Sequence, residues 1–144
     1  MRWLLFGLGA SAILLAGCGG GGHLSHREFG ERANAICSAY QSRIRSVGIL
    51  TSLSNLRIQT AAAESITNEH VARFAALEPP EEDEAGARAY VEHAERLATA
   101  LERLRQAYGR GPATVRRLFR AALREAAALR RVARALGLAE CAAR

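Results

Sequence analysis

Apolar side chains recur at steps of three and four residues in four stretches of the chain, which is the spacing of one face of an α-helix. Segments rich in glycine, proline or hydroxyl side chains separate these stretches, as is typical of connections. The four expected helices span residues 25–48, 55–77, 80–108 and 113–136. The pattern therefore predicts an all-α protein, an antiparallel up-down-up-down four-helix bundle with short connections.

Several expected helix ends carry their own signals. Ser25 and Glu28 have the serine-x-x-glutamate spacing of a capping box. Glu78-Pro79-Pro80 ends the second helix, because a proline disfavours helical geometry in the residue before it. Gly137 stands where a C-terminal cap is expected after the fourth helix, and Leu138 can fold back onto the last turn.

The fourth helix combines an apolar stripe with a stripe of arginines. The residues expected to face inward are Val115, Leu118, Phe119, Ala122, Ala126, Leu129, Ala133 and Leu136. On the opposite side of the helical wheel lie Arg116, Arg120, Arg124, Arg131 and Arg134. These five arginines fit an ordinary solvated face. They also fit contact with anionic lipid headgroups or envelope polymers, because clustered positive charge concentrates anions.

The charge is unevenly distributed along the chain, and the arginine stripe lies in the part that carries the excess positive charge. Residues 18–109 hold 10 arginines and 12 acidic residues, a net charge of −2. Residues 110–144 hold 9 arginines and 2 glutamates, a net charge of +7. The basic character of the protein therefore belongs to its C-terminal part.

The first eighteen residues differ from the rest. Met1 and Arg2 give a positive start, residues 3–14 are apolar or small, and Leu15-Ala16-Gly17 lead into Cys18. This arrangement is typical of a secretory signal, and residues 15–18 resemble the lipobox of bacterial lipoproteins. The resemblance implies a lipid on the Cys18 sulfur, cleavage before Cys18, and a location at the outer face of the bacterial cell membrane.

The alternatives for this segment are an uncleaved membrane anchor and an ordinary signal peptide. Residues 3–17 are shorter than the roughly 20 apolar residues that a membrane span needs. The four glycines at 19–22 suit a flexible tether. We therefore expect a signal peptide over residues 1–17, a lipidated cysteine and tether over 18–24, and a helical domain over 25–144.

Two further cysteines, Cys37 and Cys141, remain after Cys18. Exported proteins occupy compartments where disulfides persist, and two cysteines allow one intramolecular pairing. A zinc site would need three or four ligands, and a catalytic thiol would need a positioned base. Neither pattern occurs near these residues, so the sequence favours a Cys37–Cys141 disulfide.

Three short segments of the chain form a further pattern, Phe29-Gly30-Glu31-Arg32-Ala33-Asn34-Ala35-Ile36-Cys37, Leu77-Glu78-Pro79-Pro80 and Leu136-Gly137-Leu138-Ala139-Glu140-Cys141. Together they resemble a group of small helical exported lipoproteins of actinobacteria, whose activity is uncharacterised. The resemblance implies an exported helical protein with a disulfide, and it implies no catalytic residues.

The histidines offer the one alternative chemistry. His70 and His93 could meet across the bundle as a metal or haem pair, whereas an ordinary hydrogen-bonded role is the simpler interpretation. The Glu-x-x-His motif of di-iron bundles is missing, because Thr67 and Tyr90 precede these histidines by three residues. The haem motif Cys-x-x-Cys-His and the common hydrolase and phosphate-loop motifs are also missing from the sequence.

We therefore expect a lipid-anchored structural or binding module of the cell envelope. We expect no enzymatic activity, cofactor or metal, and no nucleic-acid partner, since export removes the protein from nucleic acid. An accessory lipoprotein of a transporter or envelope enzyme is a further alternative. No residue identifies a protein partner.

The lipobox assignment is testable by substitution. Cys18→Ala should abolish lipid labelling of the chain, because the sulfur is the expected attachment atom. The protein should then leave the membrane fraction or accumulate unprocessed. Metabolic labelling with a fatty-acid probe measures this, and unchanged labelling of the variant would contradict the assignment.

Overall fold

The structure, a computed structural model, describes residues 23–48 and 53–143. Its elements are α1 (His26–Ser46), α2 (Leu53–Ala75), a short 3₁₀ helix η1 (Glu81–Asp83), α3 (Glu84–Gln106), α4 (Pro112–Ala135) and α5 (Ala139–Ala142). The predicted all-α class is confirmed for this part of the chain. The expected signal peptide, Cys18 and the tether glycines lie outside the described residues.

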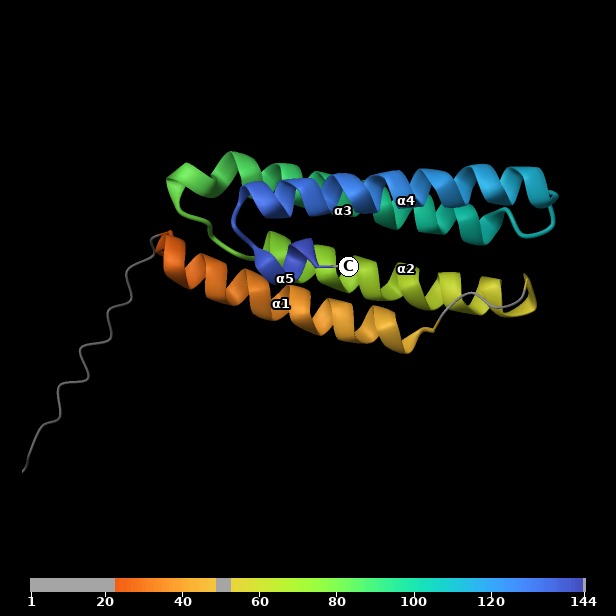
Figure 1. Cartoon of the computed structure of the whole chain (residues 1–144), viewed down its shortest axis with the longest axis horizontal. Helices are drawn as coiled ribbons and strands as arrows, with labels where there is room; N and C mark the ends of the chain where they lie inside the picture. Colours follow the sequence, from red (N-terminus) through yellow and green to blue (C-terminus); the bar gives the residue numbers. More distant parts are fainter. Residues whose placement is uncertain (1–22, 49–52, 144) are drawn as a thin grey trace, which may run out of the picture.

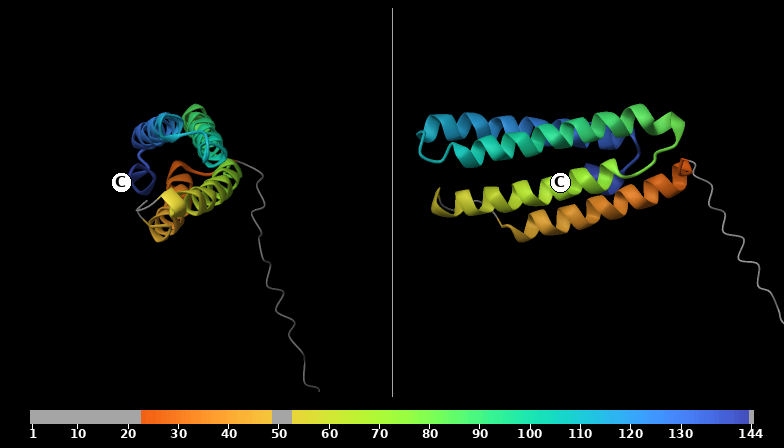
Figure 2. Two further views of the ribbon diagram at one scale, coloured as in Figure 1. Left: turned by 90° about the vertical axis from the view of Figure 1, so that its right-hand side faces the viewer. Right: turned by 180° about the vertical axis from the view of Figure 1, so that it is seen from behind.

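The four long helices lie side by side, and successive helices run in opposite directions (Figures 1 and 2). Each long helix packs against the next one in the chain, α1 on α2, α2 on α3 and α3 on α4. The short helix α5, which the sequence pattern did not predict, contacts both α1 and α4. None of the described helices is long and apolar enough to cross a membrane.

The expected caps are present at both ends of the fold. At the start of α1, the Ser25 hydroxyl accepts a hydrogen bond from the Glu28 N–H (3.3 Å), and the Glu28 carboxylate accepts one from the Ser25 N–H (3.1 Å). At the end of α4, Gly137 has φ of 70°, and the Leu138 N–H donates to the Ala133 carbonyl (2.9 Å). Leu138 is buried, so it does fold back as predicted.

An aromatic cluster connects three helices in the core. Phe74 of α2 stacks on Tyr90 of α3 with 4.1 Å between ring centroids, and Phe29 of α1 meets Phe74 edge-on at 6.1 Å. Such aromatic pairs contribute about 0.5–1.5 kcal/mol each beyond the area that they bury. All three rings are almost fully buried, so this cluster fixes α1, α2 and α3 relative to one another.

The prediction that Phe119 faces inward is wrong, since its side chain is 36% exposed. Helix α4 packs on α3 and α5, and α5 lies beside its C-terminal half (Figure 1). The side chains of Ala122, Leu129 and Ala133 are buried in this packing. Phe119 lies in the N-terminal half of α4, beyond the reach of α5, and therefore remains partly exposed.

The Cys37–Cys141 disulfide is present and joins α1 to α5. The two Cα atoms are 4.9 Å apart, and both residues are buried. The cysteines are separated by 104 residues in the sequence, so the bond closes a loop that contains α2, α3 and α4. The described helices, their buried core and the disulfide all lie within residues 23–143.

Removal of this bond should destabilise the domain. Loss of a native disulfide costs about 2–5 kcal/mol, because the unfolded chain gains freedom when a long loop opens. Reduction, or the double change Cys37→Ala and Cys141→Ala, should therefore lower the melting temperature followed by circular dichroism. Peptide mapping without reductant supplies the control for pairing. Two free thiols in the purified protein, or an unchanged melting temperature after reduction, would contradict this account.

Candidate functional site

A buried histidine lies at the centre of the described fold. His70 of α2 is 3% exposed, and its Nε2 atom lies 2.9 Å from the Tyr90 hydroxyl of α3. The Tyr40 ring of α1 covers the imidazole, with 4.5 Å between ring centroids. Phe74, one helical turn after His70, packs at 6.0 Å. Three helices therefore position the imidazole.

The face of α2 that turns into the core is unusually polar, which explains its weak apolar pattern. Thr60 and Thr67 are buried, and their hydroxyls each donate to a carbonyl one turn earlier, at Leu56 and Ala63 (2.7 Å in both cases). Such local bonds satisfy the hydroxyl without a partner from another helix. The Thr60 hydroxyl also lies 2.8 Å from that of Tyr108.

Burial determines the electrostatics of this site. Loss of hydration lowers the pKa of His70 to about 4 and raises the pKa of Tyr90, so both are neutral at pH 7. Among the described residues, the His70 Nδ1 atom is buried and has no hydrogen-bond partner. The Tyr90 hydroxyl also lies 3.4 Å from the Cys37 sulfur, so this polar chain ends at the disulfide.

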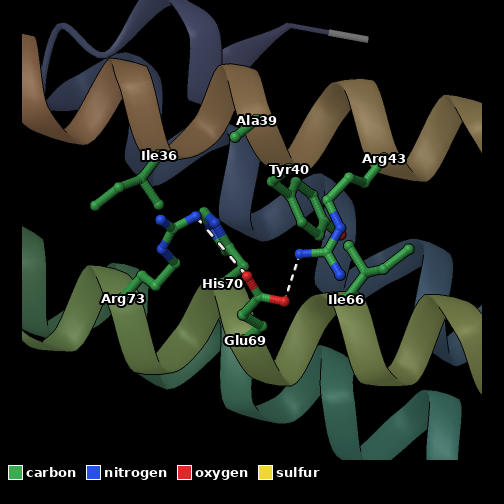
Figure 3. Close-up of a pocket in the computed structure, with 8 residues that line it drawn as sticks. All are labelled: Ile36, Ala39, Tyr40, Arg43, Ile66, Glu69, His70 and Arg73. Atoms are coloured by element: carbon green, nitrogen blue, oxygen red, sulfur yellow. Dashed lines mark hydrogen bonds and ion pairs between the residues drawn. The ribbon is translucent and has the colours of Figure 1, made fainter.

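A small cavity adjoins the imidazole between α1 and α2, as Figure 3 shows. Its lining residues are Ile36, Ala39, Tyr40, Arg43, Ile66, Glu69, His70 and Arg73. Glu69 pairs with both Arg43 and Arg73, and the hydrogen bond from Arg43 lowers the pKa of the Glu69 carboxyl. The cavity volume of about 10 Å³ matches one water molecule.

His93 has a different environment. It is half-buried on α3, and its Nδ1 atom lies 3.0 Å from the Glu125 carboxylate of α4. Arg96 also donates to this carboxylate (3.4 Å). The hydrogen bond from His93, followed by that from Arg96, lowers the pKa of the Glu125 carboxyl. His93 therefore connects α3 to α4.

His70 and His93 have different hydrogen-bond partners in the structure. Each histidine uses one ring nitrogen on a different protein group, the Tyr90 hydroxyl and the Glu125 carboxylate. Within residues 23–48 and 53–143, no three histidine, cysteine or acidic side chains are arranged to hold a metal ion.

The other two histidines hold the start of the domain, a role that the sequence analysis missed. His26 Nδ1 lies 2.6 Å from the Asp83 carboxylate, and His23 Nδ1 lies 2.7 Å from the Pro79 carbonyl. The Leu24 N–H donates to the Glu78 carbonyl (2.9 Å). The sequence does show the residues that make these contacts, two histidines at the start of the first helix and an acidic run before the third. Nothing in the sequence pairs them with one another.

The basic face of α4 consists of Arg116, Arg120, Arg124, Arg131 and Arg134, all of them exposed. None of the five forms an ion pair with an acidic side chain in the part of the chain that the structure describes. By contrast, Arg43, Arg96 and Arg105 on other helices each pair with a glutamate. The one acidic residue of α4, Glu125, is engaged by α3. The basic face therefore carries uncompensated positive charge.

Comparison with known proteins identifies no relative. No protein-family model, no curated protein and no solved structure significantly matches the chain. A role must therefore be inferred from the described residues themselves, among them the buried His70 site and the basic face of α4.

The His70 site should make the protein sensitive to acid. Well above pH 6.5 the imidazole is neutral in both the folded and the unfolded state and contributes no pH dependence. Below pH 6.5 the unfolded chain binds a proton at His70 first, because the folded pKa is about 4. The free energy of unfolding should then fall by about 2 kcal/mol between pH 7 and pH 5.

Urea unfolding at pH 7, 6 and 5 measures this effect, before most carboxyl groups titrate. His70→Phe should remove this part of the pH dependence, although the lost Tyr90 hydrogen bond lowers its stability at every pH. Equal pH dependence in wild type and His70→Phe would show that His70 is not the group responsible.

Proposed function

We propose that this protein is a lipid-anchored module of the bacterial cell envelope, exported and held at the outer face of the cell membrane through a lipid on Cys18. It is a non-enzymatic structural or binding module that holds α4 against an anionic surface. The observation that carries this proposal is the basic face of α4, with five exposed arginines that lack an acidic partner among the described residues.

The proposed location draws on both ends of the chain. Residues 15–18 have the form of a lipobox, and the glycines that follow suit a tether. The Cys37–Cys141 disulfide supports an oxidising compartment, since such bonds are rare in the cytosol. We infer that the domain behind the tether is an up-down-up-down four-helix bundle, and the contacts of α5 with both α1 and α4 support this arrangement.

The tether and the basic face would act together. A lipid anchor keeps the domain at high local concentration near the membrane, so weak contacts suffice to hold it in one orientation. Each arginine near an anionic surface contributes about 1 kcal/mol, and this attraction decays over a Debye length of about 8 Å at physiological salt. The ligand chemistry is a dense array of phosphates or carboxylates, as found on lipid headgroups and envelope polymers.

Vesicle binding tests the proposal. The chain of residues 23–144 should co-sediment with vesicles that contain phosphatidylglycerol and not with phosphatidylcholine vesicles, and added salt should weaken this binding. The triple change Arg116→Gln, Arg120→Gln and Arg124→Gln should weaken binding about 100-fold at low salt, since three charge contacts are lost.

A second triple variant provides the control. Arg45→Gln, Arg57→Gln and Arg103→Gln remove the same charge from exposed positions on α1, α2 and α3. This variant should bind almost as well as the wild type, with helicity of both variants verified by circular dichroism. Equal losses in the two variants would show a net-charge effect with no role for α4. Equal, negligible binding to both vesicle types would overturn the proposal.

A further inference from the structure

Large apolar side chains are exposed at three positions of the described chain. They are Ile58 on α2 (72% exposed) and Phe119 and Leu123 on α4 (36% and 51%). Phe119 and Leu123 are four residues apart, so they are neighbours on one side of their helix. Two of the three exposed apolar side chains thus belong to the helix that carries the basic face.

These two side chains lie beside the arginines. At about 100° per residue, Leu123 is about 20° around the helix from Arg116, and Phe119 is about 60° away on the same side. Arg120 and Arg124 lie on the other side of Arg116, within about 80°. The exposed arc of α4 therefore combines an apolar ridge with a row of positive charges.

Helix α4 is accessible along this arc. Figure 2, in its end-on view, shows α4 at a corner of the helix assembly, with α3 as its neighbour along the length of the helix. A helix of 24 residues is about 36 Å long and can lie flat on a surface.

We propose that this docking face, formed by Arg116, Phe119, Arg120, Leu123 and Arg124, inserts into the headgroup region of a fluid anionic bilayer. The inference rests on the proposed anionic contact and identifies its partner as lipid. A soluble anionic polymer can neutralise the arginines but leaves Phe119 and Leu123 in water. A bilayer accepts both, because the aromatic and aliphatic groups enter the acyl boundary while the guanidinium groups stay at the phosphates.

The test separates insertion from charge attraction. In residues 23–144, the double change Phe119→Gln and Leu123→Gln should weaken binding to phosphatidylglycerol vesicles about tenfold, because two partly exposed apolar groups no longer leave water. Binding to soluble polyglutamate should stay unchanged, because the arginines are intact. Ile58→Gln is the matched control on α2, and it should bind vesicles like the wild type.

A fluorescent variant gives a second measurement. The only tryptophan of the chain is Trp3, so Phe119→Trp in residues 23–144 carries a single reporter. Its emission should shift to the blue with phosphatidylglycerol vesicles and stay unchanged with polyglutamate. Wild-type vesicle affinity in the double variant, together with no blue shift, would overturn insertion. Loss of binding in the arginine variant alone would at the same time leave the proposed anionic contact standing.

Discussion

The bond between Cys37 and Cys141 fixes α5 against α1, and the packing on that side of the fold depends on it. Helix α1 packs on α2 along one side, and its other main partner is α5, a helix of four residues. Such a short helix cannot hold its position by its own hydrogen bonds, because isolated helices need many more turns to be stable in water. The disulfide supplies this constraint, and it places Cys37 against the hydroxyl of Tyr90. Tyr90 in turn contacts His70 and stacks on Phe74, so the disulfide adjoins the aromatic cluster.

The buried polar groups of this domain are neutral, whereas its surface carries charged side chains. Inside, His70 and Tyr90 are buried with few polar partners, so loss of hydration keeps them uncharged at neutral pH. Outside, the arginines of α4 remain hydrated and have no acidic partner in the described part of the chain. Neutral polar groups therefore occupy this part of the interior, whereas the surface of α4 carries exposed positive charge.

The sequence predicts the helices well, because periodic apolar positions and end signals are local properties. The capping box at Ser25 and the cap at Gly137 were both recognisable for this reason. Phe119 was misplaced, since the pattern cannot reveal that the neighbour of α4 on that side extends along only part of the helix. Helix α5 was missed because four residues are too few for a periodic pattern.

Of the two candidate sites, the sequence predicts the one that lies on a single helix and misses the one that several helices form. The arginine stripe is a property of one helix, so its residues could be read from a helical wheel. The environment of His70 could not, because it depends on rings from α1 and α3 that are distant in sequence. The buried face of α2 was also hard to recognise, because Thr60 and Thr67 count as polar in a sequence pattern. Both can be buried, since each hydroxyl donates to a carbonyl of its own helix.

The position of the disulfide also has a mechanical consequence. If tension acts between an anchor at Cys18 and the C-terminal tail, the load passes from Cys37 directly to Cys141 and bypasses the chain between them. Only residues 18–37 and the last few residues can then be pulled straight, which limits the extension to about 65 Å before Cys37, against about 430 Å for an unbridged chain. Helices α2, α3 and α4 lie within the bypassed loop. Under such a load the disulfide would protect the helix that carries the arginines from being unravelled.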